Sequence, residues 1–407
     1  MLERLLDITR KLAAPYELTT MLTEVIDAGR AMLNADRASV FLYDRDRDEL
    51  YTTTATGVDE IRFPAARGLA GECARSRRAI NVPDCYADPR FNREVDQTTG
   101  YHTRCMLSVP LIGHDDVLVG VLQLLNKNGG VFVAEDEQIA SAVAAQCAVA
   151  LQRVRLIADM VARKKLEHEM VLAHEAQQRV FPTQMPTIPG YDIAAWSRQA
   201  DQTGGDIYDV ISLDGHRHLL LLGDATGHGL APALSITQFR AMLRMAVRMG
   251  ASLDAAYASI NEQLVEDLPD NKFVTAFLGL FDASAHTVTY HSGGQGPLLH
   301  FHAATGACEW HGATTVPMGM LGGLPLAQPQ VFELEAGDVI VLASDGVLEY
   351  PNTAAEQFGT ERVGDLVRAG QGASMAELID VVRQAVDQFG TGVIQPDDMS
   401  MLVLKRQ

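Results

Sequence analysis

Several features that mark other classes of protein are scarce in this sequence. The five cysteines are odd in number and show no Cys-x-x-Cys spacing, which argues against a disulfide framework or a zinc ribbon and fits a reducing cytoplasm. Nowhere do about 18 apolar residues run together, and the N-terminus lacks an uninterrupted apolar segment, so we expect neither a membrane span nor export. Cations are also scarce: 33 Lys and Arg stand against 52 Asp and Glu, and the net charge of -19 argues against nucleic acid and membrane surfaces as partners.

The length and composition indicate two folded domains. At 407 residues the chain exceeds the size at which one hydrophobic core stops growing. Hydrophobic residues make up 47% and charged residues 21%, as in ordinary globular proteins. The excess of carboxylates serves either solubility or the binding of divalent cations, and only the positions of the carboxylates decide between the two.

Apolar spacing predicts helices followed by a sheet in the first half. Apolar residues recur at helical spacing up to about residue 35, which predicts two short amphipathic helices. Segments of alternating polarity then predict a sheet of about five or six strands, including residues 38–43, 49–54, 79–82, 107–112 and 118–125.

A proline-free stretch from Asp136 to about Val180 predicts one long helix. The helix must end before Phe181-Pro182, because a residue before proline disfavours helical geometry. Its second half keeps apolar residues near heptad spacing, interrupted at Gln177, which indicates a weak coiled coil or dimer stalk. We therefore predict a first domain at 1–155, a helical linker at 156–187 and a second domain at 188–407.

The second domain is predicted to be an α+β sandwich of sheets covered by helices, because strand runs flank pairs of helices. The expected helices are 231–249, 253–268, 354–369 and 375–389, and the expected strands are 191–197, 207–213, 218–223, 273–282, 287–292, 298–301, 339–344 and 399–405.

Four short segments that contain aspartate, called acidic stations below, lie at strand edges or turns of this domain. They are GGDIYDV with Asp206 and Asp209, LLLLGDATGHG with Asp224, VIVLASDGV with Asp345, and QPDDMSMLVL with Asp397 and Asp398. Aspartate before glycine is ordinary turn chemistry at any single station. Four stations together instead favour a site for Mg²⁺ or Mn²⁺, which take oxygen ligands from carboxylates that converge in space.

The order of GGDIYD, GDATGHG, FVTAFLGLFD, HSGGQGP, GDVIVLASDG and DDMSMLV resembles the PPM-type metal-dependent phosphatases, in their bacterial SpoIIE/RsbU-like branch. The resemblance spans about residues 188–405. It implies a phosphoserine and phosphothreonine hydrolase with two Mn²⁺ or Mg²⁺ ions, in which a water activated by both ions attacks the phosphate.

The resemblance also implies a role for individual residues. Asp206, Asp224, Asp345 and Asp397 would be the catalytic carboxylates and metal ligands, joined by the Ala225 carbonyl and by Asp398 as a neighbour. His228 would serve either as an acid for the leaving group or as a shape-giving loop residue. Gln295 stands where this branch often carries histidine or asparagine, which leaves the phosphate contacts there open.

The first half resembles the GAF domains over about residues 15–155, through RGLAGECARSRRAINVPDCYADPRFN, VDQTTGYHTRCMLSVPLIG and VGVLQLLNKNGGVFVAEDEQIA. The set Asn126, Lys127, Phe132, Asp136 and Glu137 matches the NK, F, DE pattern of GAF domains that bind cyclic nucleotides. One interpretation of this set is purely structural: an ion pair between Lys127 and Asp136 would clamp a strand to the long helix without touching a ligand.

If the GAF pocket is used, the resemblance assigns Asp96, Thr99, Thr103 and Gln123 to the ligand, cyclic AMP or cyclic GMP. Two features depart from relatives: Gln123 replaces a glutamate, and the 53–57 stretch lacks a Phe-Asp pair. A redox or haem sensor is disfavoured, because Cys147 lies on the apolar stripe of the helix and free cysteine usually packs as a small hydrophobe.

These features together predict a cytoplasmic homodimer in which a sensor domain regulates a protein phosphatase through the long helix. The implied substrate is a phosphorylated anti-sigma-factor antagonist or a similar signalling protein. Two alternatives remain: a degenerate phosphatase fold that only recruits a partner, and a cyclic-nucleotide-binding protein with an unrelated hydrolase. The presence of all four principal carboxylates disfavours the first, and the absence of another catalytic set disfavours the second.

Overall fold

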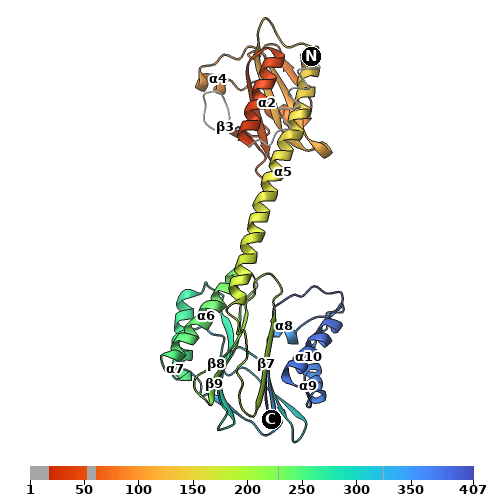
Figure 1. Cartoon of the computed structure of the whole chain (residues 1–407). Coiled ribbons are helices and arrows are strands. Elements are labelled where there is room, and N and C mark those ends of the chain that lie inside the picture. The colour runs from red at the N-terminus through yellow and green to blue at the C-terminus, as the bar shows by residue number, and fades with distance from the viewer. Residues whose placement is uncertain (1–17, 53–60, 228, 324) are drawn as a thin grey trace. The chain divides into compact units, whose positions relative to one another are not determined.

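The computed structural model describes residues 18–52, 61–227, 229–323 and 325–407, apart from the side chains of Leu18, Val95, Thr98, Thr99 and Asp115 (Figure 1). Contacts along the chain divide it into two compact units, Met1–Lys165 and Leu166–Gln407. The mixture of helices and sheets confirms the α+β prediction. Among the described helices, none is both long and apolar enough to cross a membrane.

The first unit is built on a six-stranded antiparallel sheet with the order β3-β2-β1-β6-β5-β4. Its strands are β1 Ala35–Asp44, β2 Glu49–Thr52, β3 Ile61–Pro64, β4 Ile80–Val82, β5 Met106–Ile112 and β6 Leu118–Lys127. The alternation of each strand sends side chains to two faces. Val40 and Leu122 thus pack under helix α2, Leu18–Leu33, and the first turns of the long helix α5, Ala134–Gln178. Phe41 and Val121 instead face helix α3, Gly68–Ser76.

Helix α5 runs from Ala134 to Gln178, close to the predicted 136–180, and crosses from the first unit into the second. Its 45 residues make it about 68 Å long at 1.5 Å per residue. Ala140, Val143, Cys147 and Leu151 form its buried stripe in the first unit. From Val149 onward, large apolar side chains on other faces of the helix are exposed, namely Val149, Leu156, Ile157, Met160, Val161, Leu166, Val171 and Leu172.

The second unit is a sandwich of two five-stranded sheets, β14-β11-β10-β9-β8 and β13-β12-β15-β16-β7. The strands are β7 Tyr191–Arg198, β8 Asp206–Ser212, β9 Arg217–Ala225, β10 Val274–Asp282, β11 Thr287–Gly293, β12 Leu298–His302, β13 Ala307–His311, β14 Gln330–Glu333, β15 Val339–Ala343 and β16 Met399–Arg406. Leu220, Phe277, Ile340 and Leu402 meet between the sheets. Burial of each such side chain contributes about 1.5–3 kcal/mol to stability.

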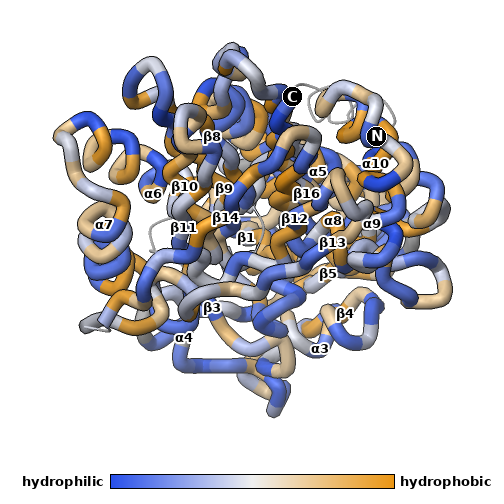
Figure 2. Tube along the Cα trace, turned by 90° about the horizontal axis from the view of Figure 1, so that it is seen from below, coloured by the Kyte–Doolittle hydropathy of each residue, from blue (hydrophilic) through white to orange (hydrophobic). Residues whose placement is uncertain are grey.

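Two helix pairs cover the outer faces of the sandwich (Figure 1). Helices α6, Leu230–Arg248, and α7, Leu253–Asp267, pack on the first sheet, and α9, Gly359–Ala369, and α10, Met375–Phe389, pack on the second. The burial of the sheets is visible in Figure 2, where strands β9, β10, β12 and β16 carry apolar colour and helix α7 carries mixed colour.

Some predicted elements differ from the structure. The helix expected at 354–369 begins only at Gly359, because the Asn352 side chain accepts hydrogen bonds from the Ala354 and Glu356 amides and holds these residues in a turn. The pattern also missed short elements: β3, β13, β14, α3 and α4, Arg93–Thr99. The expected first amphipathic helix lies outside the described residues, as do the last residues of the 49–54 strand.

Candidate functional site

Two of the acidic stations face each other across neighbouring strands. Asp206 opens β8 and Asp224 lies near the end of β9, and the antiparallel register makes them direct partners. Directly opposed like charges destabilise a sheet unless a ligand offsets them. Asp206 is buried, and its Oδ2 has no hydrogen-bond partner.

The other two stations come from the second sheet. Asp345 is the first residue of the short helix α8, Asp345–Leu348, just after β15, and Asp397 lies just before β16. Because β15 and β16 are antiparallel neighbours, the end of one lies beside the start of the other. The carboxylates of Asp345 and Asp397 both raise the pKa of Asp224, so the three lie near enough at this edge of the sandwich to interact electrostatically.

The buried carboxylates at this edge of the sandwich favour the binding of cations. Burial first, and then the Asp224 and Asp398 carboxylates, raise the pKa of Asp206 well above its ordinary range. Burial and the Asp345 charge raise the pKa of Asp224 to about 7. Burial and Asp397 raise the pKa of Asp345. Buried carboxylates that repel one another become favourable once divalent cations bind between them, so the oxygen-only donor set fits Mg²⁺ or Mn²⁺.

Glycines allow the backbone to approach these carboxylates. A Cβ on Gly205 would lie 2.5 Å from the Ala225 carbonyl oxygen and 3.0 Å from Asp224 Oδ1, and a Cβ on Gly346 would lie 1.9 Å from the Asp398 carbonyl oxygen. Any side chain at either position would displace the backbone. The glycines of GGD and SDG therefore serve close packing at the site.

Asp398 has a different environment from the other carboxylates. Its Oδ1 accepts a hydrogen bond of 2.7 Å from the Ala200 amide, and its Oδ2 accepts one of 2.5 Å from the Gly205 amide. Asp398 thus holds the loop that leads into Asp206. These contacts hold Asp398 beside Asp206, whose pKa its charge raises, at the edge where the resemblance placed it as a neighbour of the metal ligands.

Glutamines that sequence analysis did not assign to the site also hold this loop and the strands behind it. The Gln177 amide, in the last turn of α5, donates to the Gly204 carbonyl at 2.6 Å and accepts from the Gly204 amide at 3.2 Å. Gln295 donates to the Ala343 carbonyl at 3.0 Å and accepts from Thr275 at 3.1 Å, which links the two sheets. Both glutamines are buried. In the sequence, Gln177 was signalled only by its polar character on an apolar stripe, and Gln295 by its departure from the residues that the resembled branch often carries there.

Asp209 is not part of the carboxylate site. Its Oδ2 lies 2.7 Å from Arg240 Nε and 2.6 Å from Arg244 Nε, so two guanidinium groups of α6 neutralise this buried carboxylate. The predicted loop residue His228 lies outside the described residues.

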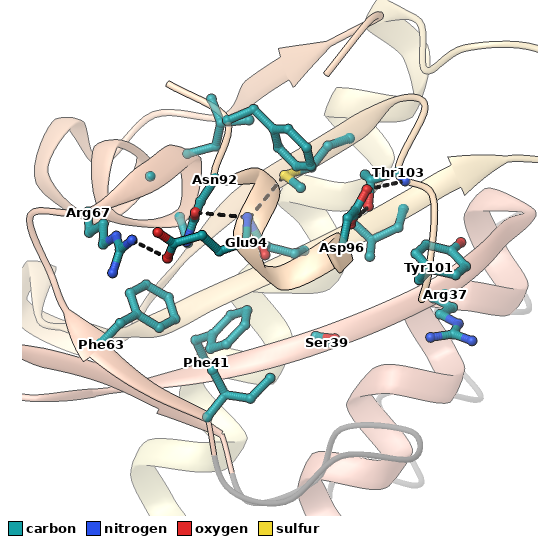
Figure 3. Close-up of a pocket in the computed structure, with 18 of the residues that line it drawn as sticks. Arg37, Ser39, Phe41, Phe63, Arg67, Asn92, Glu94, Asp96, Tyr101 and Thr103 are labelled. Atoms are coloured by element: carbon teal, nitrogen blue, oxygen red, sulfur yellow. Dashed lines mark hydrogen bonds and ion pairs between the residues drawn. The ribbon is translucent and has the colours of Figure 1, made fainter. Parts of the chain in front are cut away.

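The first unit contains a cavity of about 390 Å³ between β1, β3, α3 and α4 (Figure 3). This volume lies in the range of small-molecule sites. Three arginines that the sequence analysis did not single out line it, namely Arg37, Arg62 and Arg67. Arg67 pairs with Glu94, Arg62 pairs with Asp44 and Glu49, and the Arg37 guanidinium lies 4.0 Å from the centre of the Tyr101 ring. Phe41 and Phe63 supply apolar, edge-to-face rings.

Three of the four predicted ligand residues, Asp96, Thr103 and Gln123, line this cavity. Asp96 accepts hydrogen bonds of 2.7 Å from both the amide and the hydroxyl of Thr103, so these two buried groups satisfy each other. The Gln123 amide donates to Ser108 at 3.0 Å. The side chain of the fourth, Thr99, lies outside what the structure describes.

The NK, F, DE residues lie where β6 leads into α5. Lys127 and Asp136 form an ion pair, and Asp136 also accepts a hydrogen bond of 2.8 Å from the Val133 amide at the start of α5. Asn126 bridges the Arg104 amide and the His102 carbonyl. Phe132 is buried, while the Phe132 carbonyl and the Glu137 carboxylate both accept hydrogen bonds from the Asn81 amide.

Comparison with known proteins agrees with both halves. The GAF domain family matches residues 17–151, and the family described as stage II sporulation protein E (SpoIIE) matches residues 214–407. A probable 3',5'-cyclic phosphodiesterase of Caenorhabditis elegans is 30% identical over 183 residues, which is 41% of this chain and 25% of the relative. The chain thus spans about a quarter of that relative's length.

Solved structures resemble the second unit. The SiaA-PP2C domain of Pseudomonas aeruginosa has a TM-score of 0.54 at 19% identity and covers 60% of this chain and 99% of its own. The RsbU and RsbW domains of a Mycobacterium tuberculosis protein match at 26% identity with a TM-score of 0.48, over 56% of this chain and 63% of theirs. Residues 17–151 therefore match the GAF domain family and residues 214–407 match the SpoIIE family, and the second unit has the fold of the SiaA-PP2C domain.

Proposed function

We propose that this chain is a metal-dependent phosphatase that hydrolyses phosphoserine or phosphothreonine in a signalling protein. The observation that carries this proposal is the meeting of Asp206, Asp224, Asp345 and Asp397 at one edge of the sandwich. The charged groups that raise the pKa values of Asp206, Asp224 and Asp345 are other carboxylates. Such a site binds cations rather than a substrate phosphate directly.

These four side chains and the Ala225 carbonyl would hold two Mg²⁺ or Mn²⁺ ions. Bound ions would lower the pKa of water and neutralise charge on the phosphoryl group. The residues of the chain keep the ligands in place: Asp398 and Gln177 hold the loop before Asp206, and Gln295 ties the strand before Asp345 to the first sheet.

The proposed substrate is a phosphorylated anti-sigma-factor antagonist or a similar small signalling protein. Support comes from the match to the SpoIIE family and from the order of the motifs, which resembles the bacterial SpoIIE/RsbU-like branch. The five free cysteines suit a reducing compartment, which supports a cytoplasmic location.

We further propose that a cyclic nucleotide, cyclic AMP or cyclic GMP, occupies the GAF cavity and changes the phosphatase rate. The cavity offers aromatic surface from Phe41 and Phe63 and cationic groups from Arg37 and Arg67. A relative described as a 3',5'-cyclic phosphodiesterase adds support. The exposed apolar side chains of α5 from Val149 to Leu172 support a homodimer formed through this helix.

Phosphate release from a phosphoserine protein and from para-nitrophenyl phosphate tests the catalytic proposal. We expect turnover with Mn²⁺ or Mg²⁺ and its loss in excess chelator. The matched control is Asp214→Asn, because Asp214 is an exposed turn residue remote from the site. Substrate binding without any phosphate release would instead favour the alternative of a degenerate fold that recruits a partner.

Isothermal titration calorimetry of the full chain tests the ligand. Heat with cyclic AMP or cyclic GMP, followed by a changed phosphatase rate, is the expected result. Absence of heat with both nucleotides would refute the ligand assignment, whereas binding without a rate change would refute only regulation, since a ligand shifts an equilibrium only by its differential affinity for the two states.

A further inference from the structure

A second group of potential metal ligands lies in the sandwich, away from the carboxylate edge. It consists of His300 and His302 on β12 and Asp338 just before β15. One ligand atom from each lies within 4.8 Å of the others, and no other three such residues in the described part of the chain meet this condition. His300 and Asp338 are buried, and His302 is half-buried.

The sheet itself brings these side chains together. His300 and His302 are two residues apart on a strand, so they lie on the same face. The register places Glu309 of β13 opposite His300 and Ile340 of β15 on its other side. This is the face toward the first sheet, where His300 meets the ring of Phe332.

We propose that His300, His302 and Asp338 bind a divalent transition metal, Zn²⁺, in a structural site. His300 Nε2 lies 3.3 Å and His302 Nδ1 lies 3.8 Å from Asp338 Oδ2. Ligands at about 2.0–2.1 Å from a tetrahedral zinc ion are about 3.3–3.4 Å apart. The first distance matches this spacing, and the second needs a shift of only a few tenths of an ångström.

The surroundings orient the three ligands. His302 directs Nδ1 at Asp338 while its Nε2 lies 3.1 Å from Glu309 Oε2, which is the usual arrangement of a metal-bound histidine whose other nitrogen donates to a carboxylate. Asp338 accepts hydrogen bonds from the Ala303 amide at 2.8 Å and from the Glu335 amide at 3.0 Å. The carboxylate is therefore fixed before any metal binds.

A hydrogen-bonded cluster without metal explains the geometry less well. A charge-assisted bond between imidazolium and carboxylate is about 2.7–2.9 Å long, shorter than the 3.3 Å between His300 and Asp338. The Nε2 atom of His311 is buried and has no hydrogen-bond partner. It lies 3.6 Å from Glu309 Oε1.

Donor chemistry separates this site from the carboxylate edge. Imidazole nitrogen suits zinc, whereas carboxylate and carbonyl oxygen suit Mg²⁺ and Mn²⁺. Asp338 and Asp345 flank the five residues of β15, which span about 17 Å at roughly 3.3 Å per residue. The zinc would thus pin the β12–β13 hairpin to the turn before β15 and would take no part in hydrolysis, so the proposal stands independently of the phosphatase activity.

Metal retention by the full chain tests this inference. The protein is loaded with Zn²⁺ in a large excess of Mg²⁺, which occupies the oxygen site, then dialysed and assayed for zinc by atomic absorption. We expect one retained equivalent in the wild type and at least a tenfold loss of Zn²⁺ affinity in His302→Gln. His302 is half-exposed, so this variant should fold, as circular dichroism would verify. The control His216→Gln changes an exposed histidine outside the cluster and should bind like the wild type.

Cobalt provides the second measurement. Co²⁺ loaded under the same conditions should give the intense visible absorption of a four-coordinate site with nitrogen ligands, and His302→Gln should abolish it. Equal zinc retention by the wild type and His302→Gln would overturn the proposal. A cobalt spectrum of only weak, six-coordinate bands would overturn it as well.

Discussion

At the scale of single residues, the central feature is a set of carboxylates held at an electrostatic cost. Asp224→Asn or Asp345→Asn removes one negative charge from the proposed cation site. Because changes even beyond the direct ligands lower metal affinity or activity by about 10–100-fold, we expect each variant to lose about 100-fold or more in kcat. The measurement is phosphate release at saturating Mn²⁺, with circular dichroism to show that each variant folds. Wild-type turnover in either variant would show that the metal assignment is wrong.

The raised pKa of Asp224 predicts how stability depends on pH when metal is removed. Burial raises this pKa to about 7, whereas an unfolded aspartate titrates near 4. Between these values the folded state binds more protons than the unfolded state, so the free energy of unfolding falls as pH rises. In chelator, the melting temperature should therefore fall from about pH 5 to about pH 7.

Two comparisons isolate this effect. Asp224→Asn, which cannot ionise at this position, should show a smaller fall in melting temperature over the same range. Excess Mn²⁺ should raise the melting temperature of the wild type most at the upper end of the range, where the carboxylate would otherwise be ionised without a cation. Parallel pH profiles for the wild type and Asp224→Asn in chelator would contradict the prediction.

At the scale of elements, the last turn of α5 is joined to the loop that carries Asp206. Gln177→Ala removes both hydrogen bonds to Gly204 and leaves buried backbone groups unsatisfied, at a cost of about 1–3 kcal/mol. We expect weaker Mn²⁺ activation and lower kcat while the GAF domain still binds its ligand. The control is Gln178→Ala, because Gln178 is the exposed neighbour. Identical Mn²⁺ dependence of activity in Gln177→Ala and Gln178→Ala would show that the end of α5 does not influence the carboxylate site.

Variants at the segment between β6 and α5 test whether Lys127 stabilises the fold or contacts the ligand. Lys127→Ala leaves the buried Asp136 carboxylate without its ion-pair partner, and we expect a loss of about 1–3 kcal/mol in stability along with weaker ligand binding. Thr103→Ala removes a hydroxyl at the cavity that is bonded to Asp96. It should weaken nucleotide binding with a smaller drop in melting temperature. Thermal melting and calorimetry of both variants give the comparison. Equal melting temperatures in the two variants, together with weaker nucleotide binding in Lys127→Ala than in Thr103→Ala, would contradict the prediction.

At the scale of the whole molecule, the continuous α5 suggests that helix register transmits the ligand state. The two units divide between Lys165 and Leu166, inside this helix. Inserting two residues near Arg163 rotates the downstream part by about 200°. We expect basal phosphatase activity to survive and ligand regulation to be lost. A four-residue insertion rotates it by about 400°, close to a whole turn, and should retain more regulation. Unchanged regulation in the two-residue insertion would exclude a register-dependent coupling.

The sequence by itself determined the features that depend on local pattern. Short apolar runs predicted the long strands, such as β9 and β10, and the proline-free run before Phe181-Pro182 predicted α5 within about two residues at each end. The order of the motifs indicated both the GAF and the SpoIIE-type domains, which the family matches confirm. Short elements such as α3 and β14 escaped, because a few residues carry too little periodicity to be recognised.

Only the tertiary structure decided which polar residues act together. Asp206 and Asp209 look alike in GGDIYD, yet strand register sets Asp206 opposite Asp224, while Asp209 meets two arginines of α6. His302 and Asp338 lie far apart in sequence, and the pairing of β12 with β15 brings them together. Gln177 interrupts an apolar stripe and acquires its role only where α5 reaches the Asp206 loop. The physical reason is the same in each case: a local pattern fixes how a segment folds, but the partner of a buried polar group comes from a distant segment that the fold places beside it.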